Sequence, residues 1–276
     1  MKRIFVLLVI SCGFILTSSY ETSTISTKNA LNLNYDTSVD EVRFNKGLTT
    51  VSNEEWKLIF QDDFDTDSFN EDAWNGINKG WNYNNELQYY RKENIQVGDG
   101  SLKLNAKKEE YKGHTYTSAQ INTKSKLEVH YGKIEIRARY DGGKGLFPAI
   151  WLLPADDSKT LPEVDIMEAI GQEPKKVYMV NHFGEPNQYT TNHQMIEVQD
   201  NEQFHTYTLE WNKSELNWYI DNVLYFSNRK GVPHEPMYLI LNLAVGGNWP
   251  GNPDESTSFP STFEIDSVKI YESLRR

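Results

Sequence analysis

Three carboxylic acids, Glu163, Asp165 and Glu168, lie within one short run of this 276-residue chain. In a regular strand Glu163 and Asp165 share a face because side chains alternate, and Glu168 points to the other face. If the pair Ile166-Met167 opposes a single residue of a neighbouring strand, the resulting β-bulge turns all three acids to one face. The outer two are then four strand steps apart, about 13 Å between Cα atoms at ~3.3 Å per step. Side chains that lean together could bring the carboxyls to about 5–6 Å, against ~5–5.5 Å in retaining and ~6.5–9.5 Å in inverting glycosidases.

Three acids on one face repel one another, so their pKa values must separate. One carboxylate can then stay ionised as a nucleophile while another stays protonated as a general acid. The same run also suits a solvated acidic strand face, or a metal site, although it contains no histidine. Trp151 before the run and Trp249 after a Gly-Gly-Asn turn favour a sugar site, because aromatic faces with a few polar groups suit sugar rings.

Alternation with a period of two predicts the elements that position these residues. Apolar and polar side chains alternate over residues 102–106, 133–140, 216–220 and 263–265, as expected for strands with one buried face. The run 237–245 is apolar on both parities, which indicates a strand inside a sandwich. Turn signals rich in Gly, Asp and Asn separate these segments, and no long helical pattern appears. The sequence therefore predicts an all-β fold, a β-sandwich or jelly roll.

The amino terminus predicts export. Residues 1–19 read as a signal peptide, because the basic pair Lys2-Arg3 precedes an apolar run shorter than the ~20 residues of a membrane-spanning helix. Val9–Cys12 resembles the bacterial lipobox, whose cysteine is lipidated and tethers the protein to a membrane; cleavage at the end of the segment would instead release it. Residues 20–51 are rich in Ser, Thr and Asn and predict a flexible linker. We expect one domain over residues 52–276, in a secreted or outer-surface lipoprotein of a bacterium.

Composition limits the partners. The 28 basic and 39 acidic residues leave a formal net charge of −11, which argues against sequence-independent binding of nucleic acid. A single cysteine, Cys12, excludes an internal disulfide framework and a zinc site built from several thiolates. The hydrophobic share of 38% suffices for a substantial core. We expect a monomer with a neutral or acidic partner.

Other motifs occur along the chain in a fixed order. They are FQDDFD (60–65), NNELQY (84–89), YGKIEIR (131–137), FPAIW (147–151), EVDIME (163–168), FHTY (204–207) and LNLAVGGNWPG (241–251). Together they resemble family 16 glycoside hydrolases of the laminarinase type, over about residues 54–272. The resemblance implies a concanavalin-like jelly roll of two antiparallel sheets with a concave substrate groove. It also implies retaining cleavage of internal β-glycosidic bonds without a catalytic cofactor.

The resemblance assigns roles to the acidic run. Glu163 matches the nucleophile and Glu168 the acid/base, while Asp165 would hydrogen-bond the nucleophile and keep the proton distribution correct. His182, in Val-Asn-His-Phe, matches a histidine on the adjoining strand that supports this set, and a packed strand histidine is the alternative.

Substrate contacts follow from the same matches: Asn85, Glu135, Arg137, Trp151, Asn242 and Trp249. Glu135 and Arg137 could instead form a charged pair that braces the sheet, and Trp151 could be a core residue. Trp249 follows a flexible turn, so it is the better sugar platform.

A structural calcium site is also implied, with no part in catalysis. Its matching positions are Asp63, the carbonyl of Gly100, and Asp266. Hard oxygen ligands of this kind suit calcium, and capping or turn roles remain the alternative for the two aspartates.

Two departures bear on the substrate. Thr160-Leu161-Pro162 stands where laminarinases carry Trp-Pro-Ala-x-Gly, and the extra Met167 points away from the bulge-free lichenases. We therefore predict an endo-β-1,3-glucanase that acts on laminarin or mixed-linkage β-1,3/1,4-glucan. The alternatives are a hydrolase of a marine galactan (agar or carrageenan type), a non-catalytic carbohydrate-binding lectin, and a structural surface lipoprotein. The three acids favour a hydrolase.

Overall fold

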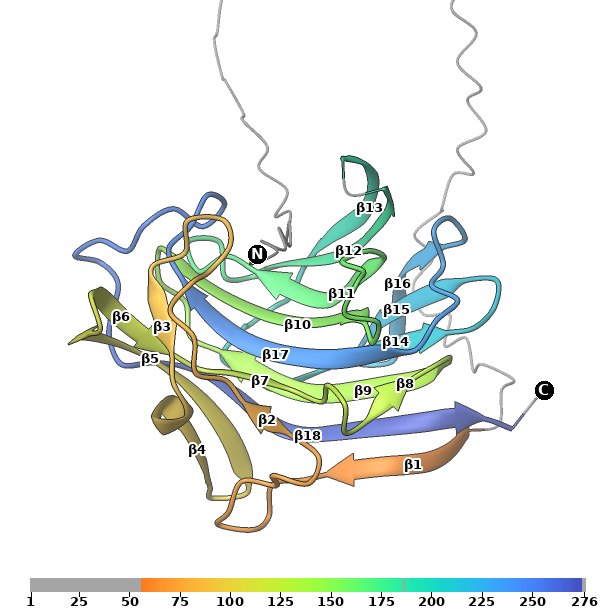
Figure 1. Cartoon of the computed structure of the whole chain (residues 1–276), viewed down its shortest axis with the longest axis horizontal. Coiled ribbons are helices and arrows are strands. Elements are labelled where there is room, and N and C mark those ends of the chain that lie inside the picture. The colour runs from red at the N-terminus through yellow and green to blue at the C-terminus, as the bar shows by residue number, and fades with distance from the viewer. Residues whose placement is uncertain (1–55, 186, 275–276) are drawn as a thin grey trace, which may run out of the picture.

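Strands dominate residues 56–185 and 187–274, the parts of the chain that the computed structural model describes (Figure 1). The predicted signal peptide (1–19), the lipidation site Cys12 and the linker (20–51) lie outside the described residues. So do residues 52–55 of the expected domain. A search of the described ranges finds no helix with the length and apolar character needed to cross a membrane.

The elements follow one another along the chain with a single 3-10 turn among them in the described part. They are β1 (Trp56–Asp62), β2 (Asn75–Gly76), β3 (Gln88–Tyr90), η1 (Lys92–Asn94), β4 (Ile95–Gly98), β5 (Ser101–Tyr111), β6 (His114–Ser118), β7 (Gln120–Asn122), β8 (Glu128–Val129), β9 (Gly132–Tyr140), β10 (Leu146–Pro154), β11 (Glu163–Ala169), β12 (Lys176–Glu185), β13 (Gln188–Glu197), β14 (His205–Trp211), β15 (Leu216–Ile220), β16 (Val223–Asn228), β17 (Met237–Val245) and β18 (Ser261–Ser273).

Two sheets form the layers seen in Figure 1. The eight-stranded sheet has the order β13-β12-β11-β10-β17-β7-β2, with β8 paired to β17. The ten-stranded sheet has the order β16-β15-β14-β9-β18-β5-β6-β3, with β1 on β18 and β4 on β5. Neighbouring strands are antiparallel except β3 and β6. The predicted all-β jelly roll is thus confirmed.

The alternating segments became strands with one buried face. In β9, for example, Ile134, Ile136 and Ala138 are buried in the core, while Glu135 and Arg137 point outward. The same period-two pattern forms β5, β15 and β18. Alternation places every second side chain on the same face of a strand, so these segments fix which side chains point into the sandwich.

The run that is apolar on both parities is β17, and it is buried along its whole length. Leu239 and Leu241 join the core between the sheets. Tyr238 and Ile240 face the other way and pack beside Trp151 on the open face of the eight-stranded sheet. A strand whose two faces both contact other side chains needs apolar residues on both parities, as the sequence indicated.

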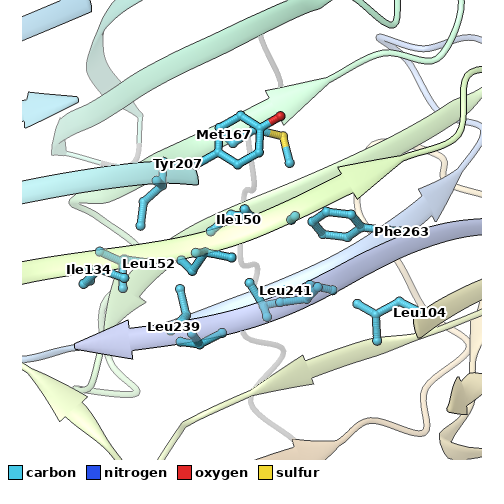
Figure 2. Close-up of a cluster of buried hydrophobic side chains, with 14 of the residues drawn as sticks. Leu104, Ile134, Ile150, Leu152, Met167, Tyr207, Leu239, Leu241 and Phe263 are labelled. Carbon is cyan, nitrogen blue, oxygen red and sulfur yellow. The ribbon is translucent and has the colours of Figure 1, made fainter. Parts of the chain in front are cut away.

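The core fills the space between the sheets. Figure 2 shows Met167 and Leu241 of the eight-stranded sheet beside Tyr207 and Phe263 of the ten-stranded sheet, and all are buried. Burial of each large apolar side chain stabilises the fold by about 1.5–3 kcal/mol. Met167 belongs to the run that carries the three acids, so packing of this core holds the strand that presents them.

Candidate active site

A groove with a cavity of about 500 Å³ opens on the eight-stranded sheet. All three acids of β11 line it, together with Trp151 of β10 and Asn242 of β17. The far wall comes from the segment between β2 and β3, from the end of β3 and from β7. Its lining residues are Ile77, Lys79, Trp81, Tyr83, Glu86, Tyr90, Gln120 and Asn122. Residues distant in sequence therefore meet on one face.

A β-bulge in β11 turns the acids to this face. On β12, Val180 pairs with Asp165 and Tyr178 pairs with Glu168, so one residue opposes both Ile166 and Met167. Ile166 and Met167 are each about fully buried in the core between the sheets. Because both side chains point inward, the alternation restarts with Glu168 on the groove side. The predicted bulge is confirmed.

The register also fixes the spacing of the outer acids. Glu163 pairs with His182 and Glu168 pairs with Tyr178, which lies four residues away along β12. Four steps of ~3.3 Å separate the two Cα atoms by about 13 Å. This is the spacing expected from the sequence for two glutamates that face a sugar from either side of one glycosidic bond.

Burial controls the protonation of the three acids. It raises the pKa of Glu168 to about 8. Burial and the charge of Glu168 also raise the pKa of Glu163 and Asp165 well above their ordinary values. A hydrogen bond between Glu163 and Asp165 lowers the pKa of Glu163 and raises that of Asp165. These opposite effects favour a proton on Asp165 and an ionised Glu163.

His182 lies against this set from β12. Its Nε2 is 3.6 Å from Oδ2 of Asp165, and its Nδ1 is 2.8 Å from Oγ1 of Thr191 on β13. Burial, with a smaller effect of His193, lowers the pKa of His182 to about 4. The imidazole is consequently neutral at neutral pH and lies beside Asp165 without adding a positive charge.

Glu163, Asp165 and His182 form the only group of three metal-ligating residues found in the described ranges, with candidate ligand atoms within 4.8 Å of one another. The sequence run had no histidine of its own, and tertiary pairing supplied one. Two buried carboxyls at this spacing can share one proton, so the close approach of Glu163 and Asp165 requires no metal ion.

A buried hydrogen-bond chain crosses the groove floor. The indole Nε1 of Trp151 donates to Oδ1 of Asn242 at 2.7 Å, and Nδ2 of Asn242 donates to the hydroxyl of Tyr90 at 3.2 Å. Trp151 pairs with Asp165 across β10 and β11. The predicted contacts Trp151 and Asn242 therefore lie in the groove, beside the acids.

The sequence reasoning missed the far wall of the groove. Lys79 lies over three rings, with Nζ 5.0 Å from the ring centroid of Trp81, 5.9 Å from Tyr83 and 5.4 Å from Tyr90. Burial lowers the pKa of Lys79 and raises the pKa of Glu86 to about 7. Trp81 remains 64% exposed, so its ring is available to a ligand.

A signal for this wall was present in the sequence. Glu86 belongs to the quoted Asn-Asn-Glu motif, and Trp81 and Tyr83 directly precede it. Polar Gln120 and Asn122 alternate with a buried isoleucine, which is the strand pattern used elsewhere.

Two predicted contacts are wrong. Glu135 and Arg137 lie on β9 of the ten-stranded sheet, on its outer face, and neither lines the groove. Glu135 pairs with Lys133 at 2.7 Å, and Arg137 pairs with Asp266 at 2.9 Å. Glu135 and Arg137 are therefore charged groups that brace the sheet, which was the alternative to a substrate contact. Each pairs with another residue and not with the other.

Two further predicted contacts flank the groove without lining it. Asn85 is exposed and donates to Oδ1 of Asn248 at 2.8 Å. Trp249 packs edge-on against Phe147 and Tyr178, with ring centroids 5.3 and 4.9 Å away. Trp249 therefore supports the wall near Glu168, because Tyr178 is the partner of Glu168 on β12.

The residues matched to a calcium site converge along one edge of β18. Strand β1 pairs with β18 over Val268–Ser273, and β5 pairs with it over Ser261–Ile265, so Asp63 and Gly100 follow and precede the paired residues on either side of Asp266. Carboxylate and carbonyl oxygens of this kind fit calcium. Arg137 already balances the charge of Asp266, and Asp63 accepts a hydrogen bond from Gln61.

Residues 82–267 match the model of glycosyl hydrolases family 16. The chain belongs to this family. It is 36% identical to the beta-glucanase of Rhodothermus marinus over 78% of this chain and 85% of that protein. It superimposes on the laminarinase catalytic domain of Thermotoga maritima with a TM-score of 0.74 and 34% identity, over 80% of this chain and 100% of that domain.

The clotting factor G alpha subunit of Tachypleus tridentatus is another relative, 34% identical over 79% of this chain. The chain spans only 34% of that longer protein. These comparisons confirm the predicted family and its laminarinase type, and the chain is a glycoside hydrolase by family membership.

Proposed function

We propose that this chain is an endo-acting hydrolase of β-1,3-glucan such as laminarin, or of mixed-linkage β-1,3/1,4-glucan, with retention of anomeric configuration. The observation that carries the proposal is the bulge at Ile166-Met167, which puts Glu163 and Glu168 on the same groove wall. The similarity to laminarinase structures supports the choice of a glucan.

In the first step, Glu163 attacks the anomeric carbon and forms a covalent glycosyl-enzyme, while Glu168 donates its proton to the departing oxygen. In the second step, the ionised Glu168 takes a proton from water, which attacks the anomeric carbon and releases Glu163. Both inversions together retain the configuration. A pKa of about 8 keeps Glu168 protonated at neutral pH, as the first step requires.

Asp165 and His182 support this cycle. The interaction of Asp165 with Glu163 lowers the pKa of Glu163, which favours its ionised form before the attack and after release of the sugar. A neutral His182 packs against Asp165 and leaves the proton on the carboxyl pair.

The groove supplies binding through stacking and hydrogen bonds. The exposed ring of Trp81 and the indole of Trp151 offer apolar faces to sugar rings. Asn242 on the groove floor and Lys79 on the far wall offer polar groups for hydroxyls. Extension of these contacts over β11, β10, β17 and β7 suits a polymer that binds across the sheet.

Digestion of laminarin, lichenan, agar and carrageenan tests the proposal. We expect short oligosaccharides from laminarin early in the reaction, with the β-anomer as the first product in proton NMR. Glu163→Gln should abolish turnover while the protein remains folded. Products from agar or carrageenan alone would contradict the glucan assignment. Binding of laminarin without any product would contradict a hydrolase and favour a lectin.

We also propose that a structural calcium ion binds near Asp63, Gly100 and Asp266 and contributes no catalytic chemistry. The convergence of these oxygen donors beside β18 supports it. Chelation by EDTA should lower the melting temperature, and added calcium should restore it. An unchanged melting curve would contradict the site.

We further propose that the chain is exported by a bacterium and acts as a monomer, either free or tethered through a lipidated Cys12. The basic and apolar start of the sequence supports export. The mass of the mature amino-terminal peptide distinguishes a lipid-modified Cys12 from cleavage further on, and light scattering measures the oligomeric state. A mature protein that retains Met1 would contradict export.

A further inference from the structure

The bulge that orients the acids breaks the hydrogen-bonding register of β11 on both of its edges. On the β10 side, Trp151 pairs with Asp165 and the next pair is Ile150 with Met167. On the β12 side, no residue pairs with Ile166 or Met167. Asp165 is therefore the last residue in register before the bulge. A buried backbone carbonyl at such a break destabilises the fold unless a donor binds it.

A tryptophan of the opposite sheet provides that donor. The indole Nε1 of Trp218 donates to the backbone carbonyl oxygen of Asp165 at 2.9 Å. Trp218 lies on β15 of the ten-stranded sheet and has no exposed surface. Its ring stacks on Phe226 of the adjacent strand, with centroids 4.8 Å apart and planes 24° apart. Packing thus fixes the direction of the N–H across the sandwich.

We propose that Trp218 is a positioning residue for the reaction: its indole N–H holds the bulge open from the opposite sheet and so keeps Glu168 on the groove side. This inference rests on the proposed function. Trp218 touches neither the substrate nor a reacting atom, because it lies on the core side of β11.

The effect should fall unequally on the two catalytic glutamates. Glu163 precedes the bulge and is held by its pairing with His182, whichever way the strand continues. Glu168 follows the bulge, so its direction depends on the two inward residues before it. Loss of the indole donor should therefore impair proton donation by Glu168 more than nucleophilic attack by Glu163.

Trp218→Phe removes the donor and keeps an aromatic ring. The matched control is Trp211→Phe, because Trp211 is a neighbouring buried tryptophan whose Nε1 donates to the carbonyl of Pro233 at 3.1 Å, away from the bulge. Each variant is compared with the wild type by kcat/KM on laminarin and on 2,4-dinitrophenyl β-laminaribioside. The dinitrophenolate departs without protonation, so its kcat/KM reports attack by Glu163 alone.

We expect Trp218→Phe to lower kcat/KM on laminarin by about tenfold or more, since general-acid catalysis contributes about 10²–10⁴-fold. The same variant should change kcat/KM on the dinitrophenyl substrate by less than about twofold. The basic limb of its pH profile should also shift. Trp211→Phe should alter both substrates equally. The ratio of kcat/KM on the dinitrophenyl substrate to kcat/KM on laminarin should therefore rise in Trp218→Phe only. An equal ratio in the two variants would overturn the proposal.

Melting curves show which variants fold. If Trp218→Phe is unfolded, Phe226→Leu takes its place, since it keeps the donor but removes the ring that directs it. The same rise in the ratio of the two substrates is then required, and its absence overturns the proposal. A wild-type protein that is active on the aryl glycoside but on no glucan would refute the proposed substrate without touching this inference.

Discussion

The protonation of Glu168 offers the sharpest test of the site, and the perturbation is pH. Burial raises the pKa of Glu168 from 4.5 to about 8, although its side chain is partly exposed to the groove. At about 1.36 kcal/mol per pKa unit, this rise corresponds to about 5 kcal/mol in favour of the protonated form. The group that must donate a proton to the leaving oxygen is therefore already protonated before substrate binds.

The magnitude follows from the titration. With a pKa of about 8, about 90% of the enzyme is protonated at Glu168 at pH 7 and about 10% at pH 9. With an ordinary pKa, about 0.3% would be protonated at pH 7. We therefore expect kcat/KM on laminarin to fall about tenfold between pH 7 and pH 9.

The assay is the pH profile of kcat/KM, since this constant reports the ionisation of the free enzyme. The dinitrophenyl glycoside serves as the control, because its departure needs no proton and its basic limb should be absent. Melting curves at each pH exclude unfolding as the cause. A basic limb centred below pH 6, or the same limb for both substrates, would refute the argument from burial.

Three more predictions follow from the same contacts. Glu168→Gln should raise the melting temperature much more at pH 9 than at pH 5, by about 2–4 °C per kcal/mol recovered, because the raised folded-state pKa costs stability progressively as the pH rises from about 4.5 to about 8. An equal shift at both pH values would contradict this. Lys79→Met should raise KM on laminarin by about tenfold, as expected for loss of a charged hydrogen bond. The control is Lys112→Met, which should leave KM unchanged because the ammonium of Lys112 lies over Tyr89 and Tyr111 outside the groove. Glu135→Gln should leave kcat/KM on laminarin unchanged. A large fall in kcat/KM would show that Glu135 contributes to the reaction after all.

The sequence alone predicted much of the site on β11. Residue types and parity placed Glu163 and Asp165 on one face, and the extra residue in Ile166-Met167 required a bulge if Glu168 was to join them. Local geometry suffices here, because a strand has only two faces and a bulge reverses parity whatever the rest of the fold. The alternating segments likewise predicted the strands that the structure contains.

Other site residues depended on how the strands assemble. Glu135 and Arg137 occupy polar positions of a strand, and the sequence pattern could not distinguish the groove face of one sheet from the outer face of the other. Both of these faces carry polar side chains, so the alternation of polar and apolar residues along the strand is the same for either sheet. Only the strand order decided that β9 belongs to the sheet without the acids.

Contacts between distant segments were likewise decided by the tertiary structure. Lys79 and Glu86 reach the groove because the segment between β2 and β3 passes beside β17, and Trp218 reaches Asp165 because two sheets pack face to face. Alternation reports whether a side chain points inward or outward, but not which partner it meets there. The sequence thus determined the chemistry on β11 and the strands that bear it, while packing determined which side chains surround that chemistry.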